Sequence, residues 1–173
     1  MDLGLLLVLV IRLLGPLLIF WWPLLGTLLS QYVFDMFDVV IWDVMGTLKH
    51  VDYTLVEKPL DLYQLTIQLI VAFRWKQEIA KKIAIGLYAY RLIGFFAYEI
   101  FHERIVFLLF PNFFFVFFLF YLVALKFNKG HWFEKKGPLA LILLVVFLIK
   151  VPQEYMLHYV EFSPWEAIKR FLN

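Results

Sequence analysis

Three basic residues lie inside long apolar segments of this chain, and their placement limits the fold more than any other feature. Arg12, Arg91 and Lys150 are each flanked by runs of aliphatic and aromatic residues. A cation in the hydrocarbon of a bilayer costs about 3 kcal/mol even on lenient insertion scales, so such residues usually face a bundle interior, an anion or water. The segments predict membrane spans, and the charges predict a polar interior.

The composition supports a membrane protein and excludes several kinds of site. Hydrophobic residues make up 64% of the chain and the mean hydropathy is +0.82, whereas about half of a soluble domain is apolar. Sixteen basic and fourteen acidic residues are too balanced to predict nucleic-acid binding. Because the chain has no cysteine, it has no disulfides, iron–sulfur clusters or c-type haem attachment. No glycine-rich loop is present to hold a nucleotide.

These features predict an all-α, polytopic membrane helical bundle that forms a single transmembrane domain over residues 1–173. About five transmembrane helices are expected, together with short interfacial helices. The expected spans cover residues 3–29, 60–77, 83–100, 105–127 and 138–159. Gly15, Pro16 and Pro23 should kink the first span, which is the longest. Glu78 and Lys82, spaced i,i+4, favour continuation of the second helix past residue 77.

Two smaller features complete the predicted fold. Ser163, Pro164 and Glu166 form the pattern of a helix start, which predicts an interfacial helix over 164–172. The phenylalanine-rich stretch 110–121 carries aromatic residues on every helical face, which favours contact with lipid or another subunit.

The distribution of basic residues predicts the orientation of the five spans. Eight basic residues fall on the side of the N-terminus: Arg74, Lys76, Lys81, Lys82, Lys126, Lys129, Lys135 and Lys136. Five fall on the other side: Lys49, Lys58, Arg104, Lys169 and Arg170. Cytoplasmic loops are enriched in lysine and arginine, so the N-terminus is predicted to be cytoplasmic and the C-terminus to lie on the opposite side.

Acidic residues and histidines are expected to gather near the outer face. Glu99 and His102 are spaced i,i+3, and Glu154 and His158 are spaced i,i+4, so each acid can share a helix face with its histidine. The candidate catalytic residues are Glu99, Glu154, His158 and Asp35. The candidate binding or ion-pairing residues are Arg91, Lys150, Arg12, Asp38, His102 and Gln153.

Simpler interpretations of the same residues stay open. Glu99 and His102 can belong to a solvated turn, and Lys150 and Glu154 can neutralise each other. Glu99, His102, Glu154 and His158 are the only metal-ligand candidates, and the pattern lacks the further glutamates of a two-metal bundle site. Arg91 is expected to be buried against a carboxylate, backbone carbonyls or an anionic headgroup, whereas Asp43, Asp52 and Asp61 are expected at the surface.

Three classes of function are compatible with this pattern. The first is a non-catalytic transport or channel protein, or a subunit of a membrane complex, with membrane lipids, further copies of the chain or a larger complex as partners. The second is a membrane-embedded enzyme that acts on a lipid or isoprenoid by carboxylate and histidine acid–base chemistry. The third is a metal-dependent oxidoreductase. The absence of a complete catalytic motif favours the first.

Overall fold

The computed structural model describes residues 3–45, 53–103, 105–160 and 165, and within them its regular elements are all helices. The helices divide into two compact units, Met1–Val71 and Ala72–Asn173, named unit 1 and unit 2 below. Within the described residues, three helical segments are long and apolar enough to cross a membrane: Leu3–Phe20, Glu78–Phe101 and Lys136–Leu157. The expected membrane helical class is therefore supported, but the expected number of five spans is not confirmed.

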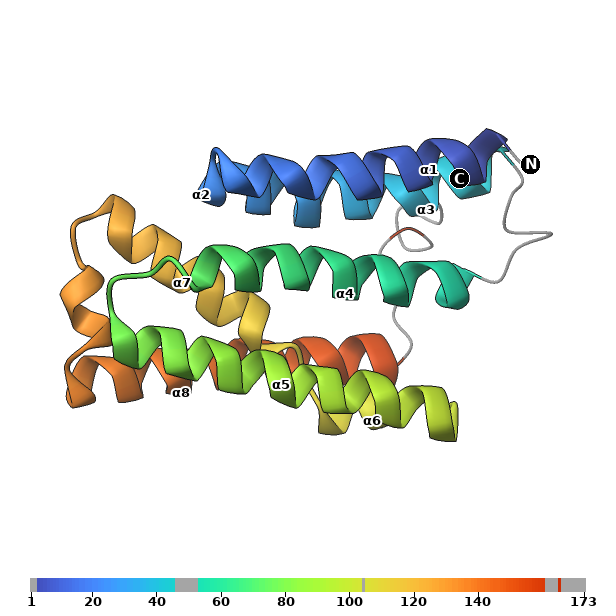
Figure 1. The fold of residues 1–173 in the computed structure, drawn as a ribbon. Coiled ribbons are helices and arrows are strands. Elements are labelled where there is room, and N and C mark those ends of the chain that lie inside the picture. The colour runs from blue at the N-terminus through green and yellow to red at the C-terminus, as the bar shows by residue number, and fades with distance from the viewer. Residues whose placement is uncertain (1–2, 46–52, 104, 161–164, 166–173) are drawn as a thin grey trace. The chain divides into compact units, whose positions relative to one another are not determined.

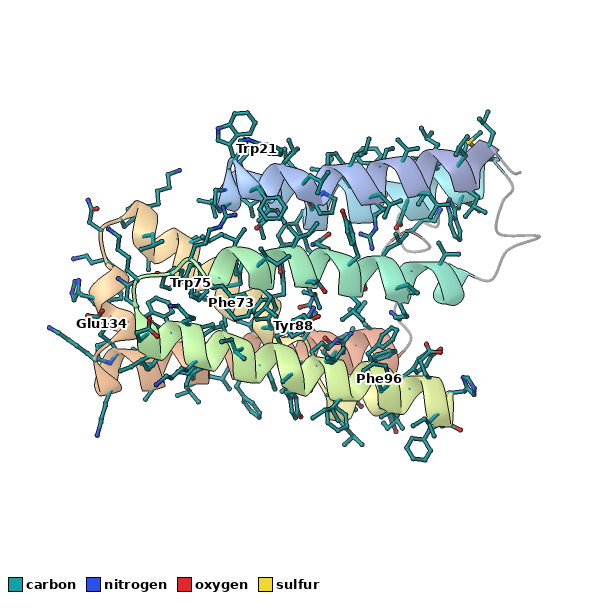
Figure 2. The ribbon with its side chains drawn as sticks, in the orientation of Figure 1. Trp21, Phe73, Trp75, Tyr88, Phe96 and Glu134 are labelled. Carbon is teal, nitrogen blue, oxygen red and sulfur yellow. The ribbon has the colours of Figure 1, made fainter. Side chains whose placement is uncertain are left out.

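Unit 1 begins with a helical hairpin where the sequence predicted one kinked span. α1 (Leu3–Leu14) continues into the 3₁₀ helix η1 (Gly15–Phe20). The chain turns at Trp21 and Trp22, and Pro23 occupies the first turn of α2 (Pro23–Leu28). Proline is favoured there because the amide it lacks would have no helical partner. Trp21 projects from this turn and is 69% exposed (Figure 2).

The second arm of the hairpin runs back along the first. After α2 come the π-helix η2 (Leu29–Phe34) and α3 (Asp35–Met45), and Figure 1 shows this arm beside α1. Gly26 lies so close to Ile19 that a Cβ atom at Gly26 would be 2.6 Å from the Ile19 nitrogen. A Cβ at Gly15 would collide with the ring of Phe34. These contacts show that the two arms run antiparallel.

α4 (Tyr53–Ala72) completes unit 1 and differs from the predicted second span at both ends. It begins before Pro59 and contains it, and it stops at Ala72 although the sequence favoured continuation through Gln77 and Glu78. At about 1.5 Å per residue its 20 residues extend about 30 Å, the thickness of a bilayer core. Tyr63 donates a hydrogen bond to the carbonyl of Leu13 at 3.0 Å, which ties α4 to α1.

The described part of unit 2 contains three antiparallel passes, of which the middle one is broken. α5 (Glu78–Phe101) is followed by α6 (Ile105–Leu109), α7 (Phe113–Lys126), the 3₁₀ helix η4 (Gly130–Phe133) and α8 (Lys136–His158). α5 packs against α6 and α7, and α8 packs against α6, α7 and η4. The predicted interfacial helix 164–172 lies outside the described residues apart from Trp165.

Aromatic side chains form the core of unit 2. Phe114, Phe117 and Phe118 of α7 are all 0% exposed. Trp75 stacks on Tyr121 with ring centroids 3.6 Å apart, and Phe133 packs edge-on against the same ring. The prediction that this phenylalanine-rich helix faces lipid or another subunit is wrong for these side chains, because they fill the interior of their own unit.

Candidate functional site

Arg12 is the centre of a buried charge cluster in unit 1. Its side chain is 2% exposed although it lies in the most apolar of the candidate spans, Leu3–Phe20, with a mean hydropathy of 2.6. The guanidinium Nη2 is 2.5 Å from Asp61 Oδ1, and Nε is 3.7 Å from Asp38 Oδ2. The cluster of Arg12, Asp38 and Asp61, called the Arg12 site below, joins α1, α3 and α4.

Each member of the Arg12 site is placed by a specific packing contact. The hairpin brings Asp38 to Arg12 because Gly26 and Gly15 let the two arms approach closely. Asp61 reaches Arg12 from α4, which is also held by the Tyr63–Leu13 hydrogen bond. Arg12 and Asp38 were both candidate binding or ion-pairing residues, without an assigned partner, whereas Asp61 was expected at the surface and that expectation is wrong. Its side chain is 30% exposed and pairs with a buried cation.

The electrostatics of the Arg12 site are asymmetric. One guanidinium faces two carboxylates, which leaves a formal excess of one negative charge when both acids are ionised. Glu57 and Lys58, one turn earlier on α4, form an ion pair of their own at 3.1 Å. Removing charges from water costs several kcal/mol per ion, which good pairing must offset. In the Arg12 site, the guanidinium provides this pairing for carboxylates from two other helices.

Polar side chains extend from the Arg12 site along unit 1. Gln64 donates a hydrogen bond to Gln31 at 3.1 Å, between α4 and η2. On α4, Asp61, Gln64 and Gln68 are spaced i, i+3 and i+7, so they share one face of the helix. On the hairpin, Thr27 and Ser30 precede Gln31, and both are buried. We call the set the polar track: Thr27, Ser30, Gln31, Gln64 and Gln68 together with the Arg12 site.

Arg91 in unit 2 has a structural partner at the break between α6 and α7. It is 8% exposed, its Nη1 donates to the carbonyl of Phe110 at 2.7 Å, and its guanidinium lies 4.6 Å from the centroid of Phe107. Tyr90 donates to the neighbouring carbonyl of Leu109. Pro111 interrupts the helix here and frees these carbonyls from helical bonding. The prediction that Arg91 is buried is confirmed, and of the three surroundings expected for it the structure shows a backbone carbonyl.

The same break also provides a backbone partner for Glu154, which in turn pairs with Lys150. Glu154 is 2% exposed, accepts the amide of Asn112 at 3.1 Å and is paired with Lys150 at 3.1 Å. Lys150 also donates to Gln153 at 3.2 Å. Lys150 and Glu154 therefore neutralise each other, which was one of the alternatives left open by the sequence. The asparagine caps α7 by accepting the amide of Phe115 at 3.2 Å.

The remaining predicted residues do not form a described site in unit 2. Glu99 and His102 are exposed, and His102 ends α5 in the left-handed conformation with φ 54°. The side chains of Asp35 and His158 lie outside the described residues, so their catalytic roles stay predictions. Within the described part of the chain, no group of three or more aspartates, glutamates and histidines is arranged to hold a metal.

Sequence reasoning missed most of the polar track. Asp61, Gln64 and Gln68 were detectable from their helical spacing in an otherwise apolar segment, but their partners on the hairpin depend on a turn that the sequence did not predict. Comparison with known proteins adds no further guide: no family model, curated protein or solved structure matches the chain.

Proposed function

We propose that this chain is a multi-pass membrane protein of the transport type that moves a proton or small cation through unit 1. The observation that supports this most directly is Arg12, almost fully buried in an apolar segment and paired with carboxylates from two other helices. Ionisable residues inside membrane segments are costly and usually mark ion pathways or proton relays. The excess carboxylate provides the group that takes up and releases the proton.

The contacts of Arg12 also support a topology for unit 1. If α1 and η1 cross the membrane, Asp38 and Asp61 lie at the depth of Arg12 because they contact it. The second hairpin arm, residues 23–45, and α4 then cross as well. Unit 2 adds three more crossings, through α5, the broken α6–α7 pass and α8, which gives six in place of the five expected from the sequence.

A sixth crossing changes the predicted orientation. The eight basic residues near the α4–α5 and α7–α8 connections then lie opposite the N-terminal end of α1. Since the more basic side is usually cytoplasmic, we propose that the N-terminal end of α1 and the C-terminal end of α8 lie on the non-cytoplasmic side. This proposal replaces the cytoplasmic N-terminus expected from five spans.

The alternative function, an acid–base enzyme for a lipid or isoprenoid, is less well supported. It would use Glu99 and Glu154 as acid and base, but Glu154 is already paired with Lys150 and Asn112, while Glu99 is exposed. A role as a subunit of a larger membrane complex is compatible with the same structure, and partner purification tests it.

Ion flux into liposomes tests the transport proposal. Purified protein is reconstituted into vesicles that contain a pH-sensitive dye, and gradients of protons, sodium or potassium are imposed. We expect the parent protein to dissipate at least one gradient, and Asp61→Asn to slow this at least about tenfold because the excess carboxylate is lost. Lys82→Gln, at an exposed position of α5, is the matched control and should retain flux. Folded parent protein that moves none of these ions contradicts the proposal.

A further inference from the structure

Among the described residues of unit 1, the polar side chains of Thr27, Ser30 and Gln68 are buried without a hydrogen-bond partner. Thr27 and Gln68 are 0% exposed and Ser30 is 1% exposed. Thr27 Oγ1, Ser30 Oγ and both amide atoms of Gln68 contact no donor or acceptor within the described part of the protein. Leaving such a group unsatisfied costs about 1–3 kcal/mol, and native proteins nearly always satisfy it. These side chains therefore indicate a bound polar species.

The three side chains belong to the same end of the polar track. Asp38 and Asp61 both contact Arg12, and Gln31 contacts Gln64. From the first of these contacts to the second, residue numbers decrease along the hairpin arm and increase along α4. The two helices are therefore antiparallel. Thr27 lies about one turn before Gln31, and Gln68 about one turn after Gln64, which places them at the same level of unit 1.

The chemistry of these groups selects the ligand. Two hydroxyls and a carboxamide offer both donors and acceptors but no charge. Water satisfies such a set, because a buried water molecule typically makes two to four hydrogen bonds to polar groups. Ser30 also lies in the π-helix η2, and π segments occur frequently at functional sites because they break the regular helical bonding pattern.

We infer that Thr27, Ser30 and Gln68 bind a short chain of water molecules that leads past the Gln31–Gln64 contact to Asp61. Gln68 and Asp61 are seven residues apart on α4, or about 10 Å. This inference deepens the proposed function and rests on it for one point, namely that the water chain delivers the proton to the Asp61 carboxylate. Arg12 and Asp38 contact or flank that carboxylate, and the Glu57–Lys58 pair lies one turn away.

Silver-ion labelling tests the hydration of the site independently of transport. The chain has no cysteine, so a single introduced thiol reports without background. Ser30→Cys is nearly isosteric, and a thiol in contact with water should react with silver ions at least about tenfold faster than one buried in apolar surroundings. The matched control is Ile67→Cys, on α4 and 4% exposed. Equal, slow reaction of both thiols overturns the inference.

A second variant separates the water chain from the proposed function. Gln68→Leu should reduce proton flux at least about tenfold because it removes the polar wall that holds the water, while Thr66→Val, on the opposite face of α4, should retain flux. Unchanged proton flux in a folded Gln68→Leu protein overturns the inference that the water chain delivers the proton to Asp61. If the parent shows no flux but Ser30→Cys reacts rapidly, the hydrated site stands and the transport proposal fails.

Discussion

At the scale of single residues, the buried charges of this protein differ in whether their partners lie nearby or far away in the sequence. Lys150 and Glu154 are one turn apart and neutralise each other, and Arg91 donates to a carbonyl that the Pro111 break leaves outside the helical pattern. Arg12 instead faces two carboxylates from distant parts of the chain. Local structure therefore does not explain the environment of Arg12.

The stability of unit 1 should depend strongly on Arg12. Arg12→Leu leaves Asp38 buried without its cation, and breaking a buried ion pair in this way costs about 3–5 kcal/mol. Denaturant unfolding in detergent micelles measures the loss of unfolding free energy. Arg12→Leu combined with Asp38→Leu should recover part of it, because the buried Asp38 charge is then absent and the remaining carboxylate, Asp61, is 30% exposed.

The control for Arg12 is an exposed cation of similar size. Lys82→Leu on α5 should change the unfolding free energy by less than about 1 kcal/mol, as expected for a surface charge. Should Arg12→Leu unfold like the parent, Arg12 and its two carboxylates do not form a stabilising site.

At the scale of helices, close packing at Gly15 and Gly26 determines how the hairpin forms. Helices approach closely in membrane proteins where small residues remove the Cβ barrier. Gly26 is such a position, because any side chain would meet the backbone of Leu18 and Ile19, which cannot rotate away. Gly94 has the same role in unit 2, where a Cβ atom would collide with Phe110.

Alanine at two glycines should therefore have opposite effects. Gly26→Ala places a Cβ 2.6 Å from the Ile19 nitrogen and 2.7 Å from the Leu18 carbonyl carbon, so we expect overpacking to cost about 1–3 kcal/mol or more. Gly86→Ala meets nothing within 4 Å and should stabilise α5 by about 0.5–1 kcal/mol through helix propensity. Thermal unfolding of both variants measures the difference. A Gly26→Ala protein as stable as Gly86→Ala would contradict the close hairpin.

At the scale of the whole molecule, the proposed number of membrane crossings depends on the hairpin. A single kinked first helix gives five crossings in total, whereas a hairpin crosses twice and gives six. The two alternatives place the N-terminus on different sides relative to the connections in unit 2, so labelling distinguishes them.

Thiol labelling of intact vesicles should detect six crossings. Glu103→Cys and Lys129→Cys, at exposed positions on opposite ends of the α6–α7 pass, should be labelled from opposite sides of the membrane. An N-terminal tag should then be accessible from the side that labels Glu103→Cys. Accessibility from the side that labels Lys129→Cys supports five crossings and contradicts the hairpin topology.

The sequence alone determined the helical class, three of the apolar segments and the burial of Arg91. These follow from local properties, namely apolar length, proline and glycine positions, and the cost of a charge in hydrocarbon. It also indicated the i,i+4 pairing of Lys150 and Glu154, because residues four apart meet on any helix.

Only the tertiary structure determined the reversal at Trp21 and Trp22, the membership of Asp61 in the Arg12 site and the burial of Gln68. A proline in an apolar run can kink one helix or start another. Here it starts another helix, because Gly26 packs closely against the backbone of η1. Asp61 is 49 residues from Arg12, so no local pattern relates them. Their contact exists because α4 lies against the hairpin, where the buried Arg12 cation pairs with carboxylates from α3 and α4.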